Sequence, residues 1–252
     1  MQVKNLPTIA ARYWIAILAA SMCGANTGDF ISHNLHLGHT RGLLPLAALF
    51  ALILWVEKRS TMASEAYYWL AIIVIRTAAT NLADLATHDL KLGYGAVETG
   101  LAALLVVVLL ADRGRGGVAV PGTRTIGGRN LPATDAQYWI AMLIAGTLGT
   151  ATGDFAAGDL GLGLGFGSVV LGAIFAAVLP IAMQVGGMSK PWYWASIVAA
   201  RSAGTTMGDF VANHHGLNLG LPLSTAFTAC LLAGIVVFWR DDSAVAVRER
   251  EA

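Results

Sequence analysis

The chain has 252 residues, of which 56% are hydrophobic and only 12% are charged, and its formal net charge is +1. Soluble domains carry about 25% charged residues, so this composition excludes an ordinary soluble protein and indicates an integral membrane protein. The balance of charge gives no reason to expect a nucleic-acid partner.

Eight segments are apolar for long enough to cross a bilayer, since a spanning helix needs roughly 20 mainly apolar residues. In chain order they cover residues 13–33, 42–57, 66–88, 94–112, 137–158, 164–185, 192–212 and 220–240. A barrel strand would alternate in polarity over roughly ten residues, whereas residues 101–110 are apolar on every face. The sequence therefore predicts an all-α transmembrane protein with eight helices.

These helices form four copies of one unit. A tryptophan precedes an aspartate by fifteen residues four times, and such a period indicates a repeat architecture. The pairs are Trp14 and Asp29, Trp69 and Asp84, Trp139 and Asp154, and Trp194 and Asp209. Because each unit has two spans, all copies share one orientation. We expect a bundle with pseudo-symmetry about the membrane normal and with the aspartate-bearing helices inside.

An arginine divides the four copies into two halves. It follows the tryptophan by seven residues only in the second and fourth copies, as Arg76 and Arg201, which are 125 residues apart (201 − 76). We predict a first half over residues 1–111 and a second half over 136–240. Residues 112–135, rich in glycine and arginine, are a predicted cytoplasmic linker, and residues 241–252 a cytoplasmic tail.

Basic residues predict the orientation, because cytoplasmic loops are enriched in them. Only Arg41 and Lys91 fall on the opposite side, so we expect both termini in the cytoplasm. A Tyr-Trp pair begins the first helix of each copy, and we expect it at the cytoplasmic interface, where aromatic rings collect. The basic residues on the predicted cytoplasmic side are Lys4, Arg12, Lys58, Arg59, Arg113, Arg115, Arg124, Arg129, Lys190, Arg240, Arg248 and Arg250.

With its four tryptophan-marked copies, the chain resembles a family of bacterial membrane proteins built from four tandem two-helix repeats, each with a characteristic tryptophan, and known as a repeat of unknown function. The resemblance covers nearly the whole chain. It implies the four-repeat architecture and, together with the charge asymmetry, a location in the bacterial inner membrane. It implies no activity and no substrate.

One face of the first helix in most copies is polar. Positions 7, 8, 11 and 15 after each tryptophan share that face at 3.6 residues per turn. The predicted pathway residues are Asp29, Asp84, Asp154, Asp209, Arg76, Arg201, Thr80, Thr150, Thr205, Asn26 and Asn81. Ionisable residues inside a membrane usually mark ion or proton routes. The alternative is structural, because polar side chains beside small residues can also join helices.

The charges favour a cation as the transported species. Four aspartates against Arg76 and Arg201 leave an excess of two negative charges if all are ionised. A divalent cation would neutralise that excess, and protonation of clustered carboxylates would do so equally well. This predicts movement of a cation coupled to protons.

Histidines support a metal ion, because all six fall near the outer ends of the aspartate-bearing helices. The predicted metal ligands are Asp29, His33, Asp84, His88, Asp154, Asp209 and His214. Two of the histidines stand four residues after an aspartate, one helical turn away. Mixed carboxylate and imidazole ligands suit Mn, Fe, Co, Ni or Zn better than Ca or Mg. The alternative is that these are hydrogen-bonded residues of the membrane interface.

The sequence thus predicts a transporter that moves a small cation through an aspartate-lined core. The more specific form of this prediction is that the cation is a divalent transition metal. No nucleophile elbow, HExxH motif or P-loop is present, so we expect no enzyme activity. No cofactor is expected beyond a divalent metal ion as substrate, and the expected partners are the lipid bilayer and the cation. Two alternatives stay open: a carrier for an organic solute whose carboxylate binds Arg76 and Arg201, and a membrane scaffold or partner subunit.

Overall fold

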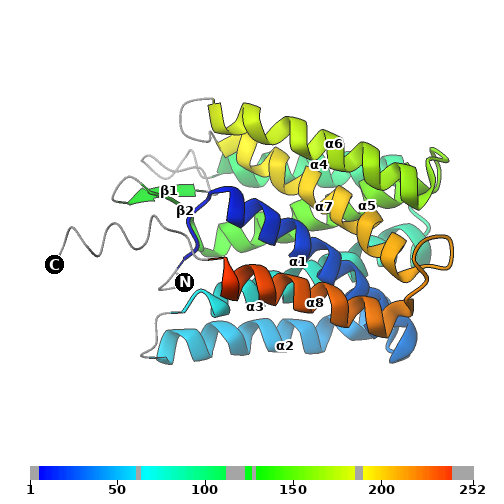
Figure 1. Cartoon of the computed structure of the whole chain (residues 1–252), viewed down its shortest axis with the longest axis horizontal. Helices are drawn as coiled ribbons and strands as arrows, with labels where there is room; N and C mark the ends of the chain where they lie inside the picture. The colour runs from blue at the N-terminus through cyan, green and yellow to red at the C-terminus, as the bar shows by residue number, and fades with distance from the viewer. Residues whose placement is uncertain (1–5, 61–63, 112–122, 127–128, 185–189, 240–252) are drawn as a thin grey trace.

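The computed structural model describes residues 6–60, 64–111, 123–126, 129–184 and 190–239, and within them eight α-helices account for most of the chain (Figure 1). The inner set comprises α1 (Ala11–Asp29), α3 (Ala66–Asp84), α5 (Ala136–Ala157) and α7 (Lys190–Ala212). The outer set comprises α2 (Gly38–Arg59), α4 (Tyr94–Ala111), α6 (Gly163–Gln184) and α8 (Gly220–Phe238). Two π-helical turns, η1 (Phe30–Asn34) and η2 (Leu85–Asp89), extend α1 and α3.

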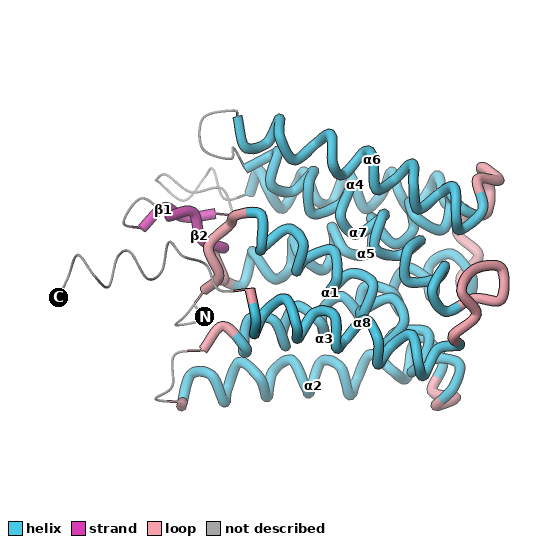
Figure 2. Tube along the Cα trace, viewed as in Figure 1, coloured by secondary structure: helices cyan, strands magenta, loops and turns pink. Residues whose placement is uncertain are grey.

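The four inner helices close into a ring. Helix α1 contacts α3 and α7, and α5 contacts the same two helices on the other side. Each outer helix packs against the inner helix that follows it in the chain: α2 on α3, α4 on α5 and α6 on α7, while α8 returns to pack on α1 (Figure 2). This arrangement confirms the predicted eight-helix bundle of four repeats with the aspartate-bearing helices inside.

Burial and hydropathy show that this is a multi-pass membrane protein. Within the described residues, every helix except α7 is long and apolar enough to cross a bilayer. In the spans that contain α1, α3 and α5, 61% of the residues are buried, against 11–22% in α2, α4, α6 and α8. The outer helices therefore present apolar side chains outward, as lipid requires. Helix α7 is the exception because it carries Ser196, Ser202 and Thr206 in addition to an arginine and an aspartate like those of α3.

Glycines allow the inner helices to approach closely. A Cβ atom on Gly24 would overlap the stem of Arg76, and one on Gly149 would lie 2.6 Å from the Cβ atom of Arg201. These two contacts are equivalent, because Gly149 follows Gly24 by the same 125 residues that separate the arginines. Small residues at such positions permit helix backbones to pack tightly inside a membrane.

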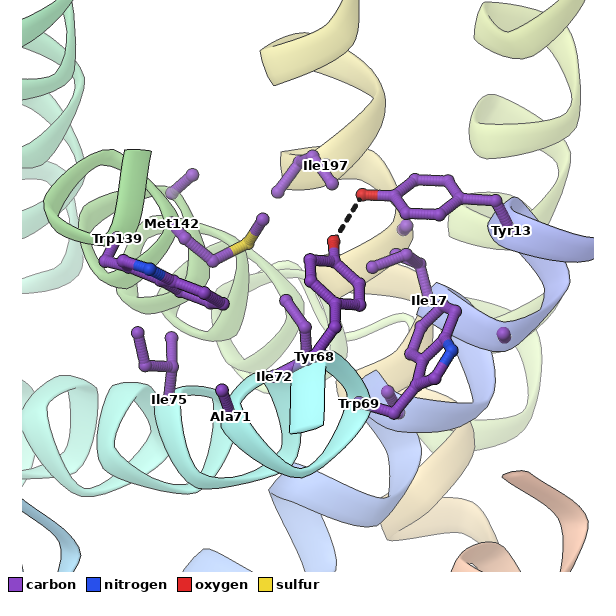
Figure 3. Packing of buried hydrophobic residues seen from close by; sticks show 14 of the residues in the cluster. Tyr13, Ile17, Tyr68, Trp69, Ala71, Ile72, Ile75, Trp139, Met142 and Ile197 are labelled. Carbon is purple, nitrogen blue, oxygen red and sulfur yellow. Dashed lines mark hydrogen bonds between the residues drawn. The ribbon is translucent and has the colours of Figure 1, made fainter. Parts of the chain in front are cut away.

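A ring of four tyrosine hydroxyl groups closes one end of the bundle. The oxygen atoms of Tyr13, Tyr68, Tyr138 and Tyr193 follow one another at 2.9, 2.8 and 3.0 Å, and a 2.6 Å hydrogen bond between Tyr193 and Tyr13 completes the cycle. All four side chains have no exposed surface. We call this set the tyrosine ring; Figure 3 shows one of its four bonds, between Tyr13 and Tyr68.

The tryptophans complete the same layer of packing. Each tryptophan meets the tyrosine before it edge to face, with centroids 5.1–5.2 Å apart, and also packs against a tyrosine of a neighbouring copy. The exposed fraction of these four tryptophans is 5% or less. The rings, which were expected at the cytoplasmic interface, lie at one end of the bundle and are buried against neighbouring repeats instead of facing outward. One aromatic layer thus packs the four inner helices at a common level, and its depth in the membrane stays a prediction.

The connection between the halves contains a feature that was not predicted. Strands β1 (Thr123–Ile126) and β2 (Arg129–Pro132) pair antiparallel, and the Ile9 N–H donates to the carbonyl of Asn130 at 2.8 Å. The Asp135 side chain then accepts from the Tyr138 N–H at 2.8 Å and so caps α5. The rest of the predicted linker, 112–122 and 127–128, and the predicted tail 241–252 lie outside the described residues.

Candidate functional site

The four aspartates line one cavity at the end of the bundle opposite the tyrosine ring. The cavity has a volume of about 530 Å³, and Asp29, Asp84, Asp154 and Asp209 all contribute to its wall. We call it the aspartate cavity. Its remaining lining residues are Ala25, His33, His39, Thr80, His88, Thr150, Leu164, Thr205, Ala212, Asn213 and Leu221.

Two turns of each inner helix build this wall. The residue four positions before each aspartate also lines the cavity, since it lies one helical turn lower on the same face. In three copies that residue is a threonine (Thr80, Thr150 and Thr205), and in the first copy it is Ala25. Positions 11 and 15 of the predicted polar face therefore converge from all four repeats, as the sequence pattern predicts.

The lining carries four carboxylates and, within the described part of the chain, neither a lysine nor an arginine. Carboxylates so close together repel one another when ionised, and a bound cation would relieve that repulsion. The cavity is thus electrostatically suited to a positively charged ligand.

Arg201 lies beneath the cavity and joins the four repeats. From the fourth repeat, its Nε donates to Thr150 Oγ1 at 2.8 Å and its Nη1 donates to the carbonyl of Ser21 at 2.6 Å. Its Nη2 donates to Thr80 Oγ1. The side chain is fully buried, and its charge acts on Asp154, Asp209 and Asp29. Arg201 therefore lies across the bundle axis with its hydrogen-bonding nitrogen atoms already engaged.

Arg76 has a different environment although it occupies the matching place in the sequence. It is also fully buried, but its Nε, Nη1 and Nη2 have no hydrogen-bond partner among the described residues. The charged groups that interact with Arg76 include the four tyrosines of the ring, whereas Arg201 interacts with Arg76 itself and with the aspartates. Both arginines were predicted as pathway residues, and neither lines the aspartate cavity.

The two predicted asparagines also lie away from the cavity. Asn26 and Asn81 are fully buried between helices, and Asn81 accepts a hydrogen bond from Ser32 at 3.1 Å. Both amide atoms of Asn26 lack a partner within the described segments. A Cβ atom on Gly208 would lie 3.2 Å from Asn26 Oδ1. This geometry favours a role for the asparagines in helix packing.

Histidines gather at one side of the cavity mouth. His33, His39 and His88 line the cavity, whereas His214 does not and its neighbour Asn213 does. His39, which was not among the predicted site residues, contacts Asp89 at 3.0 Å through Nδ1 and lies 3.8 Å from Asp84 through Nε2. His88 Nδ1 lies 3.6 Å from Asp84. These polar contacts all come from the first half of the chain, so the mouth is asymmetric.

The described residues contain no group of three or more histidine, cysteine, aspartate or glutamate side chains arranged to hold a metal ion. The predicted metal site stays a prediction, and the cavity as described suits a hydrated ion or a small organic cation better than a metal held directly by three side chains.

The two π-helical turns were not predicted either. They follow Asp29 and Asp84 directly and carry His33 and His88. Turns of this kind often mark functional sites, since the wider turn changes the direction of the side chains after it. The matching segments after Asp154 and Asp209 are not π-helical, which is a further difference between the halves.

Comparison with known proteins identifies the family. No curated protein and no solved structure matches the chain. A family described as a Repeat of Unknown Function matches four segments, 12–62, 67–113, 137–185 and 192–240. These segments correspond to the four two-helix repeats and cover most of the sequence. The chain therefore belongs to the family Repeat of Unknown Function (DUF347).

Proposed function

We propose that the protein transports a small cation across the membrane and that the aspartate cavity is the binding site. The observation that carries the proposal is the convergence of four carboxylates, one from each repeat, on a single cavity without a lysine or arginine in its described lining. Buried carboxylates inside a membrane protein usually belong to ion or proton routes. At the other end the tyrosine ring closes the bundle axis, so the pathway is open from one side only.

The class of cation follows from the size and chemistry of the cavity. A volume of about 530 Å³ exceeds that of a bare metal ion and lies within the range of small-ligand pockets, roughly 300–1,000 Å³. Carboxylates, threonine hydroxyls and imidazoles could bind a divalent transition metal with part of its hydration shell, or an organic ammonium ion. Protons compete with any cation for the carboxylates, so the affinity should fall as the pH falls, which is the basis for proton coupling.

The alternative of an organic solute bound through its carboxylate has less support. It requires a free guanidinium group in the cavity, and the three donating nitrogens of Arg201 are bound to Thr150, Ser21 and Thr80. Arg76 is outside the lining. A cationic ligand needs no such group.

We also propose a bacterial inner-membrane location with the tyrosine ring on the cytoplasmic side. In the described chain, Arg12, Lys58, Arg59 and Arg129 lie near that end of the bundle, and Arg41 and Lys91 near the aspartate end. Basic residues are enriched on the cytoplasmic side of membrane proteins. The cavity would then open outward.

Flux measurements test the proposal. The purified protein is reconstituted into liposomes, and uptake of Mn, Co, Ni, Zn, Ca, Mg and small organic ammonium ions is measured with and without a pH gradient. We expect uptake of at least one cation to fall by about tenfold or more in Asp154→Asn, because one desolvated charge contact is worth about 1.4 kcal/mol or more.

Asp159→Asn is the matched control, because Asp159 is an exposed carboxylate at the same end of the bundle and outside the cavity lining. It should leave uptake unchanged. Uptake no faster than in protein-free liposomes for every cation, or equal uptake in both variants, would contradict the proposal and favour a scaffold.

A further inference from the structure

Arg76 and Arg201 begin from equivalent places. They are related by the 125-residue offset of the two halves, and the glycines that contact their stems, Gly24 and Gly149, are related by the same offset. The guanidinium groups nevertheless differ completely: that of Arg201 makes three hydrogen bonds, and that of Arg76 makes none within the described chain. The difference therefore arises at the ends of the side chains and not at their attachment.

The guanidinium group of Arg201 marks what we call the axial position: the place on the bundle axis that it occupies, where it meets Thr150 Oγ1, Thr80 Oγ1 and the carbonyl of Ser21. The pseudo-twofold relation predicts the matching partners of Arg76. Thr80 corresponds to Thr205 (80 + 125), and Ser21 corresponds to Gly146 (21 + 125). Thr150 corresponds to residue 25 (150 − 125), which is an alanine.

One of these predicted partners is unsatisfied. Thr205 Oγ1 is buried and has no hydrogen-bond partner in the described structure, like all three side-chain nitrogens of Arg76. A buried charged group and a buried hydroxyl without partners are both costly. The twofold relation would bring these two unsatisfied groups together if the guanidinium of Arg76 turned toward the aspartates.

We infer that Arg76 and Arg201 compete for the axial position and that Arg76 occupies it, bonded to Thr205 and the Gly146 carbonyl, whenever Arg201 leaves. Two like charges do not share one place in a low-dielectric core, so one guanidinium faces the aspartates while the other faces the tyrosine ring. Arg201 occupies the axial position in the present structure because the Thr150 hydroxyl accepts its hydrogen bond, whereas the equivalent residue for Arg76, Ala25, has no hydroxyl group. The inference does not depend on which ligand the aspartate cavity binds.

The exchange would alternate the cavity floor between two arrangements. With Arg201 in place, Thr80 and Thr150 are engaged and Thr205 is not. With Arg76 in place, Thr205 would be engaged, and Thr80 and Thr150 would be released. The molecule would then have two related states, one with Arg201 and one with Arg76 in the axial position. In each state a single guanidinium group lies beneath the aspartates.

Apparent melting temperatures of the detergent-purified protein provide a crossover test. Thr150→Val and Thr205→Val each remove a hydroxyl group and keep the shape of the side chain. In the wild-type background we expect Thr150→Val to lower the melting temperature by roughly 3–10 °C, because it removes a hydrogen bond to a charged group. Thr205→Val should leave it unchanged or raise it, because that buried hydroxyl makes no bond and its removal relieves its desolvation cost.

In an Arg201→Gln background the order should reverse. Arg76 then occupies the axial position, so Thr205→Val should lower the melting temperature by a similar amount and Thr150→Val should have little effect. Ala25→Thr, which adds the missing hydroxyl, should raise the melting temperature in this background. Equal effects of Thr205→Val in both backgrounds would overturn the inference, because Arg76 would then be satisfied by water or an ion in its present place.

If Arg201→Gln does not fold, Arg201→Lys provides the same background while retaining a positive charge. A lysine cannot make the three divergent contacts of the guanidinium group. The same reversal is expected in that background, and its absence would overturn the inference equally.

Discussion

The two ends of the inner bundle are built by the same symmetry and have opposite properties. At one end four tyrosine hydroxyls form a closed ring with separations of 2.6–3.0 Å. At the other end four aspartates surround a cavity of about 530 Å³. A hydroxyl group both donates and accepts a hydrogen bond, so four of them satisfy one another, whereas ionised carboxylates only accept and repel each other.

This difference shows how a repeat protein can form a cavity at one end of its bundle and close the other end. Fourfold repetition places identical groups face to face, and the chemistry of the group then decides whether that level closes or opens. Substitutions in the packing of the inner helices should have the largest effect on stability, followed by those in the tyrosine ring and then those in the aspartate cavity.

The largest effect is expected from Gly149→Ala, which disturbs the frame that holds both ends. The new Cβ atom would lie 2.6 and 2.7 Å from the stem of Arg201 and 2.8 Å from the Val198 carbonyl. Overpacking of this kind costs about 1–3 kcal/mol, and we expect the upper part of that range because backbone is involved. Thermal unfolding measures it.

Gly100→Ala is the control for that variant. A Cβ atom on Gly100 in α4 has no neighbour within 4 Å, so the gain in helix propensity should stabilise the protein by about 0.5–1 kcal/mol. If both variants were destabilised to the same degree, the inner helices would not be more closely packed than the outer helices, contrary to our account.

Next in size is Tyr68→Phe, which breaks the tyrosine ring. It leaves the hydroxyls of Tyr13 and Tyr138 each short of one partner in a buried layer, at a cost of about 1–3 kcal/mol. Replacing all four tyrosines by phenylalanine leaves no hydroxyl group in the layer without a partner. The loss in free energy of unfolding should therefore be clearly less than four times that of Tyr68→Phe. Additive costs would show that the hydroxyls do not act as a closed ring.

A substitution at the aspartate end should raise the stability of the protein, by less than the preceding substitutions lower it. Asp154→Asn removes one of four neighbouring carboxylates in the cavity wall, and relief of their repulsion should stabilise the ligand-free protein by about 1 kcal/mol at neutral pH. The gain should shrink at low pH, where the remaining carboxylates are neutral and nothing is left to relieve. A loss of stability at neutral pH would indicate that the aspartates join helices.

The smallest effect is expected from His39→Gln at the cavity mouth. The contact of His39 with Asp89 is 3.0 Å long, but the carboxylate is largely exposed, with 45% of its side-chain surface accessible. Such pairs contribute about 0–1 kcal/mol. Cation affinity, measured by titration calorimetry, should change by less than about fivefold, and a loss of a hundredfold would make His39 a direct ligand.

Much of this architecture could be predicted from the sequence. Hydrophobic length indicates the eight helices, and the fifteen-residue spacing from tryptophan to aspartate identifies four equivalent positions. Equivalent positions on parallel repeats are expected to face a common axis, and the structure shows that Asp29, Asp84, Asp154 and Asp209 line one cavity there.

Other features could not be predicted, for physical reasons. A period identifies equivalent residues but not which of their side chains touch, so the closed ring of tyrosine hydroxyls was not predicted although a tyrosine precedes every tryptophan. Arg76 and Arg201 are equivalent in sequence, and only the structure shows that the guanidinium of Arg201 makes three hydrogen bonds whereas that of Arg76 makes none within the described chain.

The contacts of His39 at the cavity mouth belong to one copy of the repeat. The turn after the inner helix passes through positive φ in all four copies, at His36, Lys91, Gly161 and Asn218, but only the first copy has a histidine, His39, that reaches Asp84 and Asp89. The π-helical turns after Asp29 and Asp84 break the regular helix that four-residue spacing assumes.

Cation binding by the aspartate cavity is tested most directly by cation-dependent thermal stabilisation of the detergent-purified protein. The cations are Mn, Co, Ni, Zn, Ca, Mg and a small organic ammonium ion, and the comparison is with a variant in which all four aspartates are asparagine and with Asp159→Asn. At a concentration near 100 times the dissociation constant, a ligand of the folded state adds about 2.7 kcal/mol, or roughly 5–10 °C for a chain of this size. We expect such a shift for at least one cation in the wild type and in Asp159→Asn, and none in the fourfold variant. If no cation stabilises the wild type, or if the fourfold variant keeps the shift, the aspartate cavity is not a cation site.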